Sequence, residues 1–157
     1  MCERKYRHEL KHYINHADYL AIRRRLREIA PLDRFSGPDG SYTVHSLYFD
    51  NLDNKALREK LDGVNNREKF RIRYYNGELS YLTLEKKSKR DGLRSKKGDS
   101  ITAQEADRLF HGDTGWMKAS GRPVAAELYS KMKTQQLRPK TVVDYLRDPH
   151  VPRREHK

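Results

Sequence analysis

The sequence predicts one α+β domain, in which an antiparallel sheet carries helices on its outside. Three observations predict this class. Segments rich in aromatic and β-branched residues alternate in polarity, as half-buried strands do. Helix caps and glycine or proline stops separate them from helical segments. The Asn76-Gly77 pair is a strong signal for a tight hairpin. No repeat or linker divides the 157 residues, so we treat 1–157 as a single domain.

The N-terminal third is expected to form a strand, a helix and a second strand. The first strand covers Glu3–Ile14 and places three charged residues on one face, namely Arg7, Glu9 and Lys11. Asn15 is suited to cap the helix that follows, and Pro31 ends it. After a turn cluster at 36–40, the segment SYTVHSLYFD (41–50) reads as a strand.

The middle of the chain is expected to form a short helix and a hairpin. The helix covers Asp53–Leu61 and stops at Gly63. The segment EKFRIRYYNG (68–77) then alternates Lys69, Arg71 and Arg73 with apolar side chains. The returning strand, LSYLTLEKKSK (79–89), alternates in the same way, with Glu85, Lys87 and Lys89 on one face.

The last third is expected to contain a loop, two helices and a strand. RDGLRSKKGD (90–99) reads as a basic, glycine-punctuated loop. Thr102 and Glu105 form a capping box for a helix ending near Gly112. Pro123 suits the first turn of a helix reaching about residue 136, and KTVVDYLR (140–147) reads as the final strand.

Composition restricts the class of protein and partner. The single cysteine, Cys2, excludes an internal disulfide and a cysteine-rich metal site. No apolar run is long enough to span a membrane, and the N-terminus lacks the apolar segment of a signal peptide, so we expect a cytoplasmic location. Lys and Arg number 34 against 22 acids, a net charge of +12, which favours a polyanionic partner.

The charged faces of three strands carry the functional argument. A solvated sheet face would explain any one of them, but such a face usually mixes the two signs. If the sheet curls so that these faces point inward, the cations line a channel that needs an anion of high charge density. Net charge alone would also allow nucleic acid. However, the aromatic residues of 68–77 lie on the other face from the cations, which disfavours a single-strand-binding groove.

Five ordered segments resemble one known family. RHELKHYIN, YTVHSLYFDN, REKFRIRYYNG, YLTLEKKSK and VVDYLR are similar, in that order, to the VTC (vacuolar transporter chaperone) domain, the polyphosphate polymerase branch of the triphosphate tunnel metalloenzymes. The resemblance covers about Arg4–Asp148. It implies an antiparallel β-tunnel that binds triphosphate and a divalent metal, and transfer of the ATP γ-phosphoryl group onto a polyphosphate chain.

The resemblance implies roles for individual residues. It implies catalytic cations at Lys11 in RHELK and at Arg71 and Arg73, the paired arginines of RxRxY. It implies two more at Lys87 in LExK and at Arg147 in YxR. A basic loop residue at the tunnel mouth matches Lys96 or Lys97. Further substrate-binding candidates on the same strand faces are Arg7, Lys69, Lys89 and Tyr48; Tyr48 and Asp50 alternate with apolar residues and are as compatible with structural roles.

These residue types suit phosphoryl transfer. Its loose transition state is stabilised mainly by positioning and electrostatics, so arginines gripping oxygens and lysines acting as point charges fit the task. An ionised terminal phosphate as acceptor needs no general base. By the resemblance, Glu9 and Glu85 would hold Mn²⁺ or Mg²⁺; the alternative is that each glutamate only relieves repulsion among the cations. His8 and His12 are expected to be half-buried packing residues rather than metal ligands.

The C-terminus departs from the family pattern. The resemblance implies further strands after YxR, one with a metal-binding acid, whereas this chain ends in HVPRREHK. We therefore expect an incomplete tunnel: a fragment, a truncated copy, or a chain whose partner supplies the strands. Open sheet edges would also favour self-association.

Several functions remain open from sequence. The leading one is a metal-dependent polyphosphate polymerase domain that uses ATP, with polyphosphate or tripolyphosphate as partner. The alternative is a non-catalytic polyphosphate-binding module, and a nucleic-acid-binding domain ranks third. The lone glutamate before the lysine in RHELK disfavours a triphosphatase or cyclase of the same superfamily.

Overall fold

The computed structural model describes residues 10–34 and 36–151. In that part of the chain the strands form one antiparallel sheet in the order β4-β3-β2-β1-β5. The elements follow one another as α1 (His16–Ile29), β1 (Tyr42–Asp50), α2 (Lys55–Leu61), β2 (Arg67–Tyr75), β3 (Glu78–Arg90), β4 (Leu93–Ile101), α3 (Ala103–Phe110), α4 (Gly115–Ala119), α5 (Pro123–Thr134) and β5 (Arg138–Arg147).

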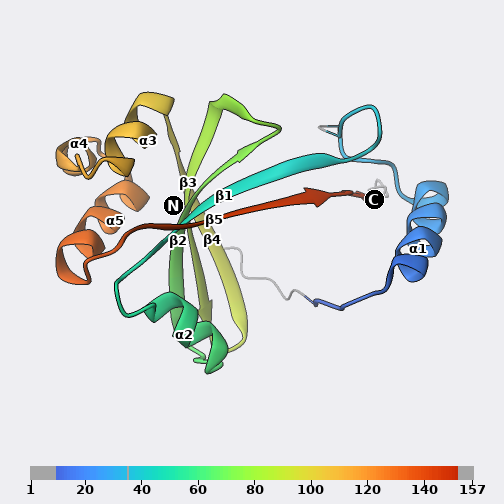
Figure 1. Cartoon of the computed structure of the whole chain (residues 1–157), viewed down its shortest axis with the longest axis horizontal. Helices are drawn as coiled ribbons and strands as arrows, with labels where there is room; N and C mark the ends of the chain where they lie inside the picture. The colour runs from blue at the N-terminus through green and yellow to red at the C-terminus, as the bar shows by residue number, and fades with distance from the viewer. Residues whose placement is uncertain (1–9, 35, 152–157) are drawn as a thin grey trace, which may run out of the picture.

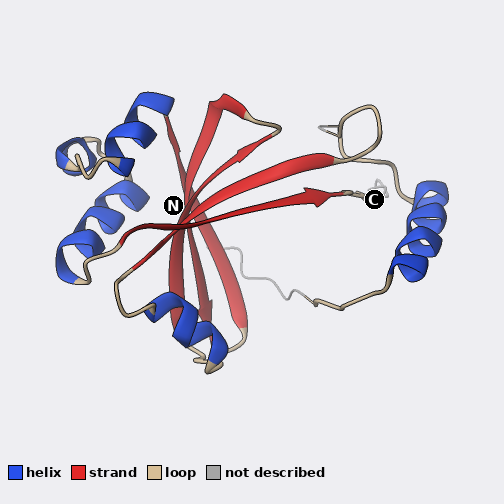
Figure 2. Cartoon of the chain, viewed as in Figure 1, coloured by secondary structure: helices blue, strands red, loops and turns tan. Residues whose placement is uncertain are grey.

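The helices lie outside an open sheet, which confirms the α+β class (Figure 2). Helices α3, α4 and α5 gather at one side of the sheet, and α1 lies at the opposite end of the molecule (Figure 1). Strands β4 and β5 are the two edges and do not pair with each other. The sheet of the described residues is therefore not a closed barrel, in agreement with the expectation of an incomplete tunnel.

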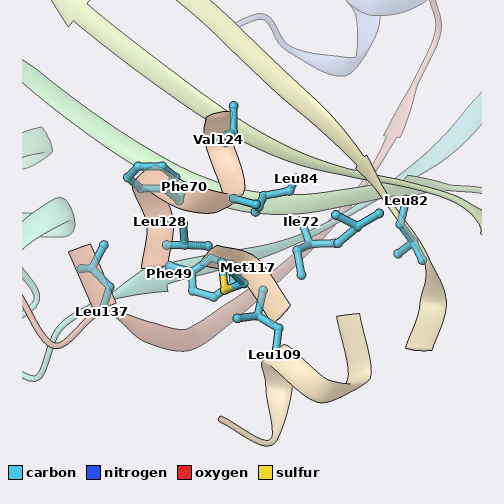
Figure 3. Packing of buried hydrophobic residues seen from close by; sticks show 12 residues of the cluster. Phe49, Phe70, Ile72, Leu82, Leu84, Leu109, Met117, Val124, Leu128 and Leu137 are labelled. Carbon is cyan, nitrogen blue, oxygen red and sulfur yellow. The ribbon is translucent and has the colours of Figure 1, made fainter. Parts of the chain in front are cut away.

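The hydrophobic core lies between one face of the sheet and helices α3–α5. Apolar residues of β2 and β3 meet side chains from each of the three helices (Figure 3), among them Phe70, Ile72, Leu84, Leu109, Met117 and Leu128. All six are at most 3 % exposed. Burying each such side chain contributes about 1.5–3 kcal/mol, so this face is committed to the core and the opposite face is left for the charged residues.

Two tight hairpins hold the central strands in register. Asn76-Gly77 joins β2 to β3 with φ of 52° and 72°, which confirms the predicted hairpin. Asp91-Gly92 joins β3 to β4 with φ of 46° and 80°. The expectation of a loop over 90–99 is therefore wrong: most of that segment is strand β4, because its backbone pairs along β3.

Side-chain caps fix the helices, one of them predicted from the sequence and two formed by residues from the sheet. Thr102 and Glu105 form the capping box of α3. Helix α5 begins with Pro123, as predicted, and is capped from the sheet, because Asp99 Oδ2 on β4 accepts hydrogen bonds from the first-turn amides of Val124 and Ala125. For Asp50, the sequence allowed either a position in the substrate site or a structural role. The structure shows a structural role, since the Asp50 carboxylate accepts amide hydrogen bonds from the first turn of α2.

The N-terminal segment differs from its prediction. Residues 10–14 carry no regular structure and are exposed, so a strand reaching Ile14 is wrong; residues 3–9 lie outside the described ones. Alternation predicts a strand only where one face is buried against a partner. His12 is also exposed rather than half-buried, and His8 lies outside the described residues.

Helix α1 begins after Asn15, as predicted, but buries none of its own residues. It is held to the chain after β5 by polar contacts: Arg23 Nε lies 3.0 Å from Asp148 Oδ2, and the Tyr19 hydroxyl donates to the same carboxylate. No helix in the described part of the chain combines the length and the apolarity needed to cross a membrane.

Candidate functional site

Strand alternation places one set of charged side chains from each of β2, β3 and β4 on the face opposite the core. The register pairs Arg71 with Glu85 and Lys69 with Lys87, and Lys87 in turn with Lys96. Directly opposite residues of an antiparallel pair share a face of the sheet. Of the three strands predicted from their charge patterns, the second and third, now β2 and β3, therefore contribute to one surface.

This surface forms an open groove of about 940 Å³. Its lining contains eleven basic residues, Lys11, Lys60, Arg67, Lys69, Arg71, Arg73, Lys87, Lys89, Arg94, Lys96 and Arg147. The acid in this lining is Glu68, while Glu85 is buried against the lining residues Arg71 and Lys96. The Glu68 carboxylate pairs with Lys86 and Lys131, neither of which lines the groove, whereas Glu85 pairs with the lining cations Arg71 and Lys96. Such an excess of one sign favours binding of a polyanion.

Glu85 is buried against the residues that line the groove, with each carboxylate oxygen bonded to a lining cation. Oε2 accepts from Arg71 Nε at 2.7 Å and from Arg71 Nη2 at 2.5 Å, and Oε1 accepts from Lys96 Nζ at 3.1 Å. Burial by itself would raise the pKa of Glu85, but Arg71 and Lys96 outweigh it and hold the pKa below its usual value. Glu85 is therefore ionised at neutral pH and fixes the Arg71 guanidinium in place.

Arg73 is also buried, yet its described partners are neutral. Its Nε donates to Ser46 Oγ at 3.3 Å and its Nη2 to the Tyr145 hydroxyl at 2.9 Å. The guanidinium of Arg147 reaches the same tyrosine, 5.7 Å from the ring centroid. Tyr145 thus orders two arginines from different strands without neutralising either of them.

Lys69 occupies the middle of the cationic surface. Its Nζ lies 4.9 Å from the ring centroid of Tyr48, whose hydroxyl accepts from Arg71 Nη1 at 3.0 Å. Burial, followed by the charges of neighbouring cations with Arg71 the foremost, lowers the pKa of Lys69 to about 8. An anion placed here would favour the charged form and restore its full charge.

The structure brings most of the predicted site residues together. Beyond those above, Lys11, Lys87, Lys89, Lys96, Tyr48 and Arg147 line the groove. Lys97 pairs with Lys86 on the helix-covered face, so between the two candidates of SKKG the geometry favours Lys96. Arg7 and Glu9 lie outside the described residues.

Sequence reasoning missed three lining cations, Lys60, Arg67 and Arg94. Arg67 continues the alternation of Lys69 and Arg71 by one step toward the N-terminus, a signal that was present. Arg94 was hidden because its segment reads as a loop. Lys60 comes from α2, and only the tertiary fold brings that helix to the groove.

The described residues do not fit a carboxylate metal site. They contain no cluster of three or more His, Cys, Asp or Glu side chains suited to an ion. Glu85, the ligand suggested by the resemblance, already accepts from Arg71 and Lys96 through both oxygens. A metal here would have to displace one of these cations, and this structure supports no chemical step through it.

Chemically, the groove can bind an extended anion along several strands. Arginines supply planar donor pairs, whereas lysines supply point charges. An anion of repeating phosphates matches this arrangement, because each of its units carries charge and acceptor oxygens along the path of the cations.

Comparison with known proteins identifies a family for the chain. A family model described as VTC domain matches residues 6–156, nearly the whole chain. No curated protein matches the chain.

Proposed function

The chain belongs to the VTC domain family, whose function concerns polyphosphate, and on that premise we propose that its groove binds the triphosphate of ATP and a polyphosphate chain. As the finer proposal, it acts as a polyphosphate polymerase domain, moving the γ-phosphoryl group of ATP onto the end of the polymer. One observation supports this above all others: cations from separate strands converge on one groove, and two of them, Arg71 and Lys96, share the buried carboxylate of Glu85.

The geometry suggests a division of labour among the cations. Arg73 and Arg147, ordered by Tyr145, would hold phosphate oxygens at one part of the groove. Lys69 and Lys87, cross-strand partners on the central strands, would neutralise charge along the chain. Because the acceptor is an ionised phosphate oxygen, transfer needs no side chain to remove a proton, and the electrostatic surface itself supplies the stabilisation.

A divalent ion, Mn²⁺ or Mg²⁺, remains part of the family-based proposal. When bound to the triphosphate it would neutralise charge on the transferred group. The described residues do not form its site, so the proposal assigns them only to binding and orientation of the phosphates.

A second candidate is a non-catalytic polyphosphate-binding module. The hydrogen bonds of Glu85 favour this candidate, because a carboxylate with both oxygens bonded to cations is poorly placed to bind a metal ion. Binding would then rest on the same cations without turnover.

One experiment separates these candidates. The purified chain is incubated with ATP and Mn²⁺, and acid-labile polymer is measured alongside tripolyphosphate binding by calorimetry. Polymer formation supports the polymerase. Binding of tripolyphosphate without polymer supports the binding module. Tighter binding of single-stranded DNA than of tripolyphosphate would contradict both and favour a nucleic-acid-binding domain.

A further inference from the structure

Lys69 combines a crowded cationic setting with an accessible position in the groove lining. From this geometry we propose that Lys69 is a covalent modification site, an amine that takes the acyl group of an acyl phosphate. The inference is separate from the polyphosphate proposal, because it requires only a small phosphorylated donor to reach this amine.

Among the described residues, the surroundings of Lys69 come from several elements. On its own strand, Arg67 and Arg71 flank it on the same face, and Lys87 of β3 is its cross-strand partner. Lys60 of α2 and Lys11 of the N-terminal segment are further cations near it, and the Tyr48 ring of β1 lies against the ammonium group. The neighbouring acid, Glu85, is occupied by Arg71 and Lys96 and is not paired with Lys69.

This setting makes the amine nucleophilic near neutral pH. Only the neutral form of a lysine carries the lone pair that attacks a carbonyl. With the pKa lowered to about 8, about a quarter of Lys69 is neutral at pH 7.5, against about one part in a thousand for a lysine with the usual pKa near 10.4.

The same cations select the donor. An acyl phosphate carries its negative charge on the leaving group, so the cations around Lys69 can hold that phosphate beside the amine. The neutral Nζ attacks the carbonyl carbon, and the carbon–oxygen bond to the phosphate breaks. Inorganic phosphate leaves with the bonding electron pair, and the nitrogen releases one proton to solvent. The product is an amide, which removes one positive charge from the groove.

The test uses acetyl phosphate on the whole, unmodified chain, with acetyl occupancy measured at each lysine by peptide mass spectrometry. Lys133 is the matched internal control, because it is exposed on α5 and its Nζ also lies near a tyrosine ring, 5.6 Å from the centroid of Tyr129. A second series replaces acetyl phosphate with acetic anhydride, an uncharged acyl donor. A third series uses acetyl phosphate in the presence of excess inorganic phosphate.

We expect Lys69 to react with acetyl phosphate at pH 7.5 on the order of tenfold faster than Lys133. The ratio should be smaller with acetic anhydride, and inorganic phosphate should slow Lys69 but not Lys133. The rate at Lys69 should level off above pH 8 to 9. A Lys69 that reacts no faster than Lys133 with acetyl phosphate overturns the proposal. If the ratio of the rate at Lys69 to the rate at Lys133 is the same for acetyl phosphate and acetic anhydride, the role of the cations in holding the phosphate is overturned.

Discussion

At the scale of single residues, Glu85 determines how a cationic groove is made stable. It is 2 % exposed and bonded to Arg71 and Lys96, so its charge offsets a local excess that would otherwise oppose folding. The sequence predicted the two strands that meet here and left two roles open for Glu85, metal ligand or partner of the cations. The observed bonds agree with the second role.

This arrangement predicts a pH dependence of stability. Since the pKa of Glu85 is lowered in the folded chain, its contribution is present above the unfolded pKa, near 4.3, and is lost as the pH falls through the folded value. Glu85→Gln should lower the free energy of unfolding at pH 7 and flatten its fall with acid. Urea unfolding between about pH 3 and pH 7 measures both effects. An unchanged slope in the variant would refute the assignment.

The hydrogen bonds of Glu85 also lead to a prediction of how tripolyphosphate binding responds to metal removal. Because cations supply the described contacts and both Glu85 oxygens are occupied, tripolyphosphate should bind as well in EDTA as with Mg²⁺, or better, since Mg²⁺ neutralises the ligand. Calorimetric titration under the two conditions checks this. Loss of binding in EDTA would mean that a metal bridges the anion to the protein.

At the scale of elements, the hairpins show what local sequence predicts and where it stops. Asn76-Gly77 was read correctly because clear strands flank it. Asp91-Gly92 carries the same kind of signal, but the strand after it contains Lys96, Lys97 and Gly98 and has little intrinsic strand preference. Pairing along β3 decides its structure. Helix α4 was missed because five residues give no periodic pattern.

The contact between Asp99 and α5 couples this strand to the core. Asp99→Ala removes the acceptor for two first-turn amides of α5, and we expect a loss of about 1–2 kcal/mol in the free energy of unfolding. Asp107→Ala, at an exposed position on α3, is the control and should cost less. Chemical denaturation of both variants tests the point, and equal losses would show that the cap contributes nothing of its own.

At the scale of the molecule, the open sheet of residues 10–34 and 36–151 leaves β5 as an edge with apolar side chains on both faces. Val142, Val143 and Leu146 are 64 %, 39 % and 69 % exposed. Exposed edges of this kind favour pairing with other chains. We expect association that grows with protein concentration and that Val142→Lys reduces. Sedimentation velocity over a range of concentrations measures it, and a monomer at all concentrations would contradict the expectation.

The whole sheet also explains why the groove was only partly predictable. Alternation along β2 and β3 predicted which of their side chains share the charged face of the sheet. The register of those strands then brings Lys69 beside Lys87. The positions of Lys11 and Lys60 depend instead on how the N-terminal segment and α2 lie over the sheet. Periodicity along one segment carries no information about such distant approaches.

The most direct test of the convergent groove is tripolyphosphate titration of two charge-matched double variants. Lys69→Gln with Lys87→Gln removes two cations inside the groove, whereas Lys118→Gln with Lys133→Gln removes two exposed ones on the helices of the other face. At about 1.5 kcal/mol for each charged contact, the groove variant should bind about a hundredfold more weakly than the unmodified chain, and the control variant should bind like it. Equal affinity in both variants would contradict the account.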